Sequence, residues 1–229
     1  MTTAPDHPLG PGDAAPNFQL PAVNHEGTVS LDDYRGRKPV MVGLFKGLSC
    51  PFCRRQIARF SITRDKLAQE GVEAVAIVNT PLDRARQYFQ YRPTRVALAT
   101  DPDVQTHRAY GITKVQIVAD STDPRELHWP HTGTIAQLAA TAINPTGELP
   151  EPMSLFAASE LLNAKDGFEE TEADKRIMEA HATQRTGHFL IDAQGTIRWA
   201  HTEAPDSPNQ LGSFPGEEEM LAAARAVTR

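Results

Sequence analysis

The sequence predicts an α/β fold with a central sheet flanked by helices. Apolar, partly β-branched runs alternate with helix-like segments between residues 38 and 111. A β-hairpin pattern follows at residues 187–201, and a helix pattern closes the chain. Strands that alternate with helices are typical of α/β proteins, so a sheet covered by helices is the expected architecture.

The N-terminal part is predicted to be an arm followed by short extended pieces. Residues 1–12 are rich in proline and glycine. From residue 13 onward, extended pieces surround the turn signal "HEG" at residues 25–27, and "LDDYRG" predicts a short helical turn that ends at Gly36.

The alternating part supplies the core of the predicted sheet. We expect strands at residues 38–46, 72–79 and 96–101, and helices at residues 51–69, 81–92 and 102–111. Residues 38–46 are apolar at nearly every position, as in a strand buried on both faces. Pro51 suits the first position of a helix, where its missing N–H would have no partner anyway. Gly71 and Pro93 end the first two helices.

The C-terminal part contains the hairpin and a last helix. In "GHFLIDAQGTIRWAH", two apolar strands flank the turn "DAQG". Residues 216–229 predict a helix whose first turn holds three glutamates, where the helix dipole favours negative charge.

Residues 113–183 depart from the alternation. Helix-like patterns at residues 134–143, 153–163 and 170–182 make this stretch too structured for a linker, so we interpret it as a mainly helical insertion. The predicted organisation is one domain, 1–229, whose core comprises residues 13–112 and 184–229. The sequence leaves open whether the insertion covers a functional site or forms the face of a homodimer.

Composition and charge exclude several classes of function. The chain has 229 residues and a net charge of −6, without a basic run, which argues against nucleic acid or an anionic membrane as the main partner. It also lacks an apolar stretch long enough to cross a bilayer. The N-terminal residues do not follow the secretory signal pattern, so a cytoplasmic location is expected. In that compartment a CxxC pair more often serves redox or metal chemistry than structure.

The two cysteines of the chain lie together in "GLFKGLSCPFCRRQIARF", residues 43–60. Cys50 precedes the predicted helix, where free N–H groups and the helix dipole stabilise a thiolate and lower the cysteine pKa. Lys46, Arg54 and Arg55 are candidates to add to this effect. Cys53 lies almost one turn further on and is expected to be the less exposed of the two. We therefore expect Cys50 to attack and Cys53 to resolve the mixed disulfide.

Other interpretations of this cysteine pair remain open. The two residues can be buried structural cysteines. A zinc site needs about four ligands, so histidines would have to complete it; copper carriage by the cysteines and a histidine is the related alternative. A protein-binding module that keeps the fold without turnover is a further hypothesis.

The segment "FKGLSCPFCRR" resembles the active-site segment of peroxiredoxin-like proteins with CPxC, in the AhpC/TSA (redoxin) branch of the thioredoxin-fold superfamily. The stretch from "GDAAPNF" to "DDYRG" is similar to the opening hairpin of that branch, and "FLIDAQGTIRW" is similar to its last two strands. The resemblance covers residues 13–112 and 184–204. It implies a thioredoxin-like fold and an antioxidant-type oxidoreductase, either a thiol peroxidase or a disulfide reductase. It also implies no organic cofactor, a peroxide or protein disulfide as substrate, and a thioredoxin- or glutathione-type reductant.

Two departures from the peroxiredoxin pattern concern the substrate site. In the spacing P-x-x-x-T-x-x-C, Gly43 and Gly47 stand where the family has proline and threonine, and Ser49 is a displaced substitute for the hydroxyl. Thr186 stands where peroxiredoxins have an arginine and thioredoxins a cis-proline; Arg185 is one position away.

Phe52, between the two cysteines, is expected either at the loop tip, where it would contact a protein substrate, or in a groove near the sheet. The predicted substrate-binding residues are thus Ser49, Phe52, Arg185 and Thr186.

Overall fold

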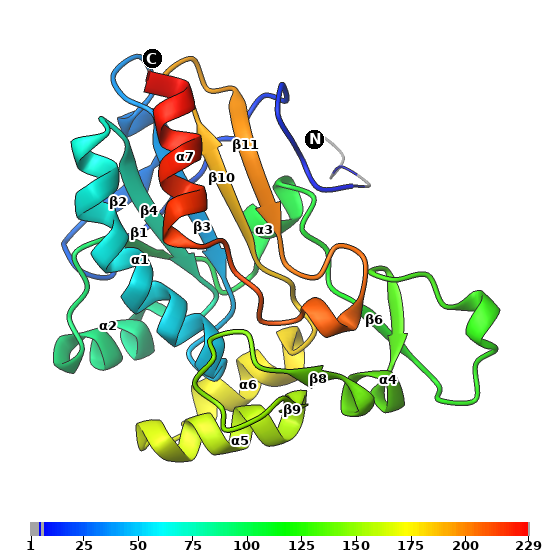
Figure 1. Ribbon diagram of the computed structural model, residues 1–229. Helices are drawn as coiled ribbons and strands as arrows, with labels where there is room; N and C mark the ends of the chain where they lie inside the picture. The colour runs from blue at the N-terminus through cyan, green and yellow to red at the C-terminus, as the bar shows by residue number, and fades with distance from the viewer. Residues whose placement is uncertain (1–4, 6, 229) are drawn as a thin grey trace.

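The computed structural model of the chain describes residue 5 and residues 7–228 (Figure 1). The predicted N-terminal arm therefore lies partly outside the described residues, as does the last residue of the predicted C-terminal helix, Arg229.

The centre of the molecule is a mixed five-stranded sheet with the strand order β11-β10-β3-β4-β5. Its strands are β3 (Val40–Phe45), β4 (Glu73–Val78), β5 (Ala97–Thr100), β10 (Gly187–Ile191) and β11 (Ile197–Thr202). Strands β3, β4 and β5 are parallel, whereas β10 is antiparallel to both of its neighbours. All six residues of β3 are buried, as its continuous apolar sequence predicts.

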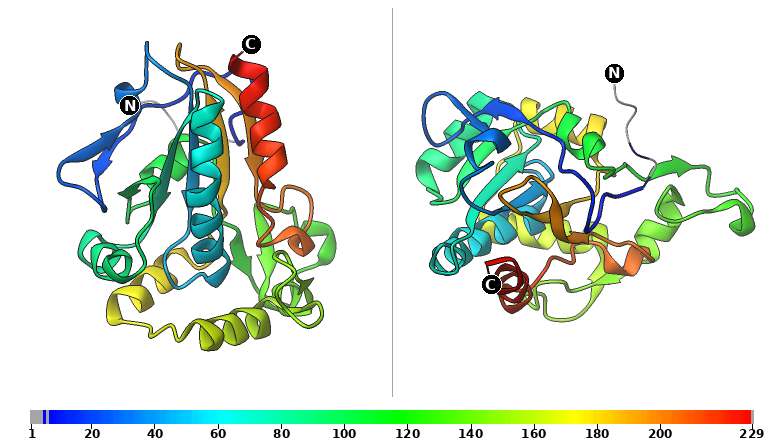
Figure 2. Two further views of the ribbon diagram at one scale, coloured as in Figure 1. Left: turned by 60° about the vertical axis from the view of Figure 1, so that its left-hand side comes forward. Right: turned by 90° about the horizontal axis from the view of Figure 1, so that it is seen from above.

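Helices α1 and α7 lie side by side on one face of this sheet (Figures 1 and 2). The helices of the alternating part and of the C-terminus are α1 (Pro51–Gln69), α2 (Leu82–Tyr91), α3 (Gln105–Ala109) and α7 (Glu217–Thr228). Helix α1 ends before Gly71, whose φ of +78° is a conformation that favours glycine. One core cluster joins this face to α1 and α7, with Phe45, Phe60 and Met220 among its buried members.

The N-terminal part covers the other face. It forms the hairpin of β1 (Gln19–Pro21) and β2 (Thr28–Ser30), followed by a 3-10 turn at Leu31–Asp33. Its buried Phe18 and Leu31 pack in a second core cluster with Tyr110, which follows α3.

Residues 113–183 contribute no described strand to the central sheet. Their elements are β6 (Gln116–Val118), a 3-10 turn at Pro124–Glu126, β7 (Thr132–Thr134), α4 (Ile135–Ala140), β8 (Ala142–Ile143), β9 (Met153–Ser154), α5 (Leu155–Asp166) and α6 (Glu172–His181). Helix α4 is shorter than predicted because the chain turns into β8 after Thr141, whose hydroxyl donates to the Gln137 carbonyl. Helices α5 and α6 lie across the end of the sheet at which α1 begins (Figure 1).

Candidate functional site: a dithiol at the start of helix α1

Helix α1 begins with both cysteines in its first turn. Cys50 is the N-cap, with an extended backbone (φ −81°, ψ 107°), and Pro51 is the first helical residue. The Cys50 sulfur accepts the backbone N–H of Cys53 at 3.3 Å. A free N–H group of the helix start therefore points at this sulfur, which is the arrangement that stabilises a thiolate.

The Cys50 thiol is half-buried and acidic. The Cys53 thiol, which hydrogen-bonds to it, is the largest influence and lowers its pKa. Burial opposes this effect, whereas the positive charge of Lys46 and the Cys53 N–H lower the pKa further, to about 7. The Cys50 thiol therefore ionises closer to neutral pH than an ordinary cysteine thiol does.

The Cys53 thiol has the opposite character. It is buried, and burial raises its pKa well above the ordinary value, as do its hydrogen bond to Cys50 and the charge there. Cys53 thus holds its proton while Cys50 is ionised. This difference matches the predicted order of attack, with the more exposed and more acidic sulfur first.

A buried ion pair lies beside the two sulfurs. The Lys46 ammonium, just after β3, is 3.4 Å from a carboxylate oxygen of Glu203, just after β11. Glu203 also accepts the backbone N–H groups of Thr186 at 2.9 Å and Gly212 at 2.7 Å, which satisfies its buried carboxylate. Burial alone would lower the pKa of Lys46, but Glu203 and the cysteines raise it, so the residue keeps its charge.

The structure separates the four predicted substrate-binding residues into two pairs. Ser49 and Phe52 line a cavity of about 250 Å³ that also contains Cys50. Arg185 and Thr186 are buried but do not belong to the described lining of this cavity. Arg185 donates to the Thr113 carbonyl, and Thr186 donates its backbone N–H to Glu203.

Phe52 is not exposed at a loop tip, so that expectation is wrong. Its side chain is only 3% exposed and packs in a cluster with Ile143, Leu149 and Leu162, all from residues 113–183. It lines the cavity and does not project into solvent. Its proposed contact with substrate therefore has to occur inside the cavity.

Arg54 and Arg55 bind α5 and do not face solvent as free helix residues. The Arg54 guanidinium donates to Asp166 at 2.6 Å and to Asn163 at 2.7 Å, and Arg55 holds the other oxygen of Asp166 at 2.7 Å. Arg54 also donates to the Leu48 carbonyl, in the loop that precedes Cys50. These residues fasten residues 113–183 to α1, so the two segments enclose the cavity together.

Most of the cavity wall comes from residues 113–183. Helices α4, α5 and α6 contribute apolar side chains, namely Ile135, Leu138, Leu155, Phe156, Ile177 and Met178. Three polar lining residues directly follow strands of the central sheet, namely Lys46 after β3, Asn79 after β4 and Glu203 after β11. Of these, Asn79 and Glu203 were not anticipated from the sequence, although they directly follow β4 and β11, and the ends of sheet strands often build sites.

The space around Gly47 is too small for the threonine of the peroxiredoxin pattern. A Cβ atom at Gly47 would lie 2.7 Å from Asn79 Oδ1 and 3.0 Å from Ile177 Cγ2. A threonine therefore does not fit at position 47 unless Asn79 or α6 moves. The amide of Asn79 occupies the space next to the position where the family places its hydroxyl.

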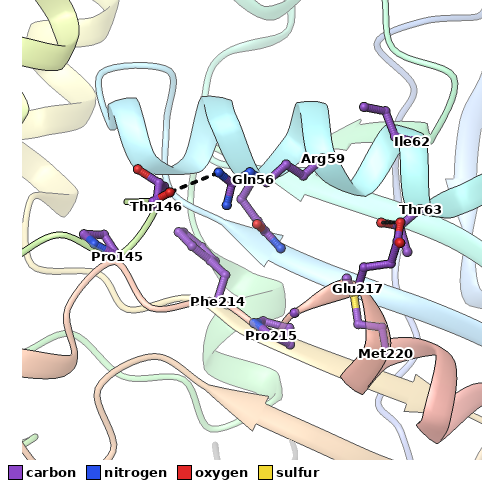
Figure 3. Close-up of a pocket in the computed structure, with 11 residues that line it drawn as sticks. Gln56, Arg59, Ile62, Thr63, Pro145, Thr146, Phe214, Pro215, Glu217 and Met220 are labelled. Carbon is purple, nitrogen blue, oxygen red and sulfur yellow. Dashed lines mark hydrogen bonds between the residues drawn. The ribbon is translucent and has the colours of Figure 1, made fainter. Parts of the chain in front are cut away.

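A second, larger cavity lies between α1 and α7. It has a volume of about 480 Å³ and is lined by Gln56, Arg59, Thr63, Phe214 and Glu217, among others (Figure 3). Neither cysteine lines it. It offers no thiol, so the chemistry of the dithiol is confined to the smaller cavity.

Within the described part of the chain there is no group of three or more His, Cys, Asp and Glu side chains arranged to hold a metal ion. Among the helices at residues 5 and 7–228, none is both long and apolar enough to span a membrane.

A mixed sheet flanked by helices, with an acidic cysteine at the start of the helix after its central strand, defines a thioredoxin-fold protein with a candidate dithiol site. The model of the AhpC/TSA family matches residues 11–148, which is more than half of the chain. The chain therefore belongs to the AhpC/TSA family. A comparison with curated protein sequences gives no match.

Solved structures agree on the fold. The peroxidoxin BcpB from Mycobacterium tuberculosis has a TM-score of 0.56 at 13% identity, with 96% of this chain and 98% of that chain covered. A 2-Cys peroxiredoxin of Plasmodium vivax has a TM-score of 0.54 at 13% identity, covering 94% of each chain. A structure from Chlorobium tepidum, described as a candidate thiol:disulfide interchange protein DsbE, has a TM-score of 0.51 at 20% identity, with 94% and 99% covered. At these identities the likeness concerns the thioredoxin-like fold.

Proposed function

We propose that the protein is a thiol–disulfide oxidoreductase in which Cys50 attacks and Cys53 resolves. The observation that carries this proposal is the pairing of an acidic, half-buried Cys50 sulfur with a buried, protonated Cys53 one helical turn away. A general oxidoreductase role agrees with membership of the AhpC/TSA family.

The reaction has two exchange steps. The Cys50 thiolate attacks one sulfur of a disulfide R–S–S–R′, so that a Cys50–S–R bond forms, the substrate S–S bond breaks and R′S⁻ leaves. Cys53 then loses its proton and attacks the Cys50 sulfur, which forms the Cys50–Cys53 disulfide and releases RS⁻. The two protons of the dithiol end on the two products. The substrate gains two electrons and the protein dithiol loses two.

Lys46 supports both steps electrostatically, whereas the charge of Glu203 opposes ionisation of both thiols. Lys46 stabilises the Cys50 thiolate, and its charge also favours ionisation of Cys53 in the second step. A thioredoxin- or glutathione-type thiol is the proposed reductant that restores the dithiol. The cytoplasmic location expected from the N-terminal sequence belongs to the same proposal.

A thiol peroxidase is the second candidate, and family membership favours it. In that reaction the Cys50 thiolate attacks one oxygen of a peroxide ROOH, the O–O bond breaks, RO⁻ leaves and Cys50 becomes a sulfenic acid. Cys53 then attacks the Cys50 sulfur, which closes the disulfide with loss of water. Gly47 in place of the threonine and the engagement of Arg185 with Thr113 rather than Cys50 favour disulfide exchange instead.

Trapping of the mixed disulfide tests the proposal. In Cys53→Ser, Cys50 should accumulate as a covalent adduct with one half of a model disulfide, detected by mass spectrometry, while the wild type accumulates its internal disulfide. Parallel stopped-flow exposure to hydrogen peroxide separates the two candidates. Oxidation of Cys50 by peroxide much faster than that of free cysteine, with no adduct from any disulfide, would support the peroxidase and contradict disulfide exchange.

A further inference from the structure

The cavity at Cys50 has an unusual polar feature at its inner end. The Asn79 side chain is 1% exposed and lines the cavity, yet among the described residues neither its amide nitrogen nor its amide oxygen has a hydrogen-bond partner. Leaving a buried amide unpaired is unfavourable, so such a group calls for an explanation, and in a cavity a bound ligand is one. Its complement is a group that both donates and accepts, such as another amide.

The charge of the cavity lining is balanced. Lys46 and Glu203 are its charged residues among those described, and they pair with each other at 3.4 Å. His181 is the remaining titratable side chain besides Cys50; burial, followed by the charge of Lys114, lowers its pKa, so it is neutral at pH 7. Apart from the Cys50 thiolate, which is the reacting group, no unpaired charge is left in the described lining to bind an anionic or cationic substrate.

The size and wall of the cavity favour a small ligand with an apolar body. Cavities that bind drug-sized molecules usually measure about 300–1,000 Å³, and this cavity measures about 250 Å³. Its wall is mostly apolar, and Ile135, Phe156 and Met178 remain partly exposed at 48%, 49% and 39%. These three side chains come from three different helices of residues 113–183, namely α4, α5 and α6.

The structure assigns to this cavity a specific substrate class: small, uncharged disulfides that carry an amide or similar group beside the sulfur atoms. Asn79 pairs with the amide, the side chains of α4, α5 and α6 hold the apolar body, and the disulfide lies at Cys50. The inference rests on the proposed function. The bond changes are those of the two exchange steps, with the substrate reduced to two thiols and the protein dithiol oxidised.

A charge series of disulfides of similar length tests this assignment. N,N′-diacetylcystamine is uncharged and has an amide on each arm, cystamine has the same backbone with two ammonium groups, and 3,3′-dithiodipropionate carries two carboxylates. The reduced wild-type protein is mixed with each, and the rate is divided by the rate of free cysteine with the same compound. The normalised rate for the uncharged compound should exceed both others by about tenfold or more.

Two variants and a matched control test whether Asn79 and Phe156 cause the preference for the uncharged disulfide. Asn79→Ala and Phe156→Ala should each lower the normalised rate for N,N′-diacetylcystamine by about tenfold, which corresponds to one lost hydrogen bond or apolar contact. Leu161→Ala is the control, because Leu161 lies on the same helix as Phe156, is 43% exposed and does not line the cavity. Methyl methanethiosulfonate, which has no amide, converts Cys50 to its methyl disulfide with release of methanesulfinate, and the pH profile of this reaction should be the same in all three variants.

The outcomes separate this inference from the proposed function. Equal normalised rates across the series, with no change in Asn79→Ala or Phe156→Ala, would overturn the substrate class while leaving disulfide exchange intact. A protein disulfide reduced faster than every small compound, with Phe156→Ala and Leu161→Ala affected alike, would overturn it in favour of a macromolecular partner. Absence of any Cys50 adduct would contradict the proposed function itself.

Discussion

The two cavities beside helix α1 differ in a way that cavity size does not predict. The larger, of about 480 Å³, lies between α1 and α7, and its charged lining residues Glu217 and Arg59 pair with Lys66 and Glu148. The smaller, of about 250 Å³, contains an acidic thiol, a buried ion pair and the unpaired amide of Asn79. The reactive thiol and its ion pair, rather than volume, distinguish the candidate site.

The same comparison shows what residues 113–183 contribute. In the smaller cavity they supply most of the wall and are fastened to α1 through Asp166. In the larger cavity they contribute only Pro145 and Thr146 (Figure 3). Of the two roles that the sequence left open for this segment, covering the cysteine cavity is the one that these contacts favour.

The largest effect should come from replacing the Cys50 thiol, which lines the smaller cavity and not the larger one. Cys50→Ser replaces the thiolate with a hydroxyl that is not ionised at pH 7, so disulfide reduction should fall by roughly 100-fold or more. A coupled assay of disulfide reduction measures this. Arg59→Ala, in the other cavity, is the control for nonspecific damage; equal losses in the two variants would erase the functional distinction between the cavities.

A smaller effect on the reactivity of Cys50 is expected from removing the charge of Lys46, and none from removing that of Lys66. Lys46→Met removes the charge that stabilises the thiolate, so the midpoint of the Cys50 alkylation rate should rise from about pH 7. As the pH falls, the thiolate of this variant is then protonated at a higher pH than in the wild type. If the midpoint rises by one pH unit, the alkylation rate at pH 6 falls about tenfold. Lys66→Met breaks the exposed pair with Glu217 and should leave the midpoint unchanged. A midpoint unaffected by Lys46→Met would show that this residue does not tune the thiol.

The attachment of residues 113–183 to α1 should matter for stability. Asp166→Asn removes the carboxylate shared by Arg54 and Arg55, which we expect to lower the free energy of unfolding by about 1–3 kcal/mol. Urea titration measures this loss.

The pH dependence of the loss of stability in Asp166→Asn tests whether the ion pairs with Arg54 and Arg55 cause it. Burial would raise the pKa of Asp166, but its hydrogen bonds with Arg55 and Arg54 lower it below the ordinary value of 3.8. The stabilisation is therefore present above about pH 4 and disappears as the pH falls through the lowered pKa. A loss that stays constant below that pH would contradict the ion-pair explanation.

The smallest effect is expected in the larger cavity. Arg59 is more than half exposed, and it contacts Glu148 at 3.6 Å and the Thr146 carbonyl at 3.3 Å. Arg59→Ala should change stability by less than about 0.5 kcal/mol, as is usual for surface positions, and should leave the rate of disulfide reduction unchanged. A clear loss of activity would assign a function to this cavity as well.

Local sequence patterns predicted the central sheet and the position of the cysteines. Strands such as β3 and helices such as α1 are specified by continuous apolar runs, Pro51 and Gly71, which act over a few residues. The cysteine pair was recognisable because its chemistry depends on two positions three residues apart. The AhpC/TSA resemblance rested on the same local segments, and the family match confirms it.

The rest of the site depends on contacts between distant parts of the chain. Arg54 meets Asn163 and Asp166 across more than 100 residues, so its burial could not be inferred from its place in a helix. Phe52 is buried for the same reason, because its neighbours come from residues 113–183. Glu203 and Asn79 follow ordinary strands, and only the strand order brings both to the cavity of Cys50.

The central claim is that Cys50 and Cys53 form one reversible two-electron couple. The direct test equilibrates the protein with graded ratios of oxidised and reduced dithiothreitol, quenches with acid and counts free thiols by mass spectrometry. The account predicts a single transition in which both thiols disappear together and the monomer becomes lighter by two hydrogen atoms, reversibly. Two thiols that persist at every ratio, or oxidation only to dimers linked between chains, would contradict it.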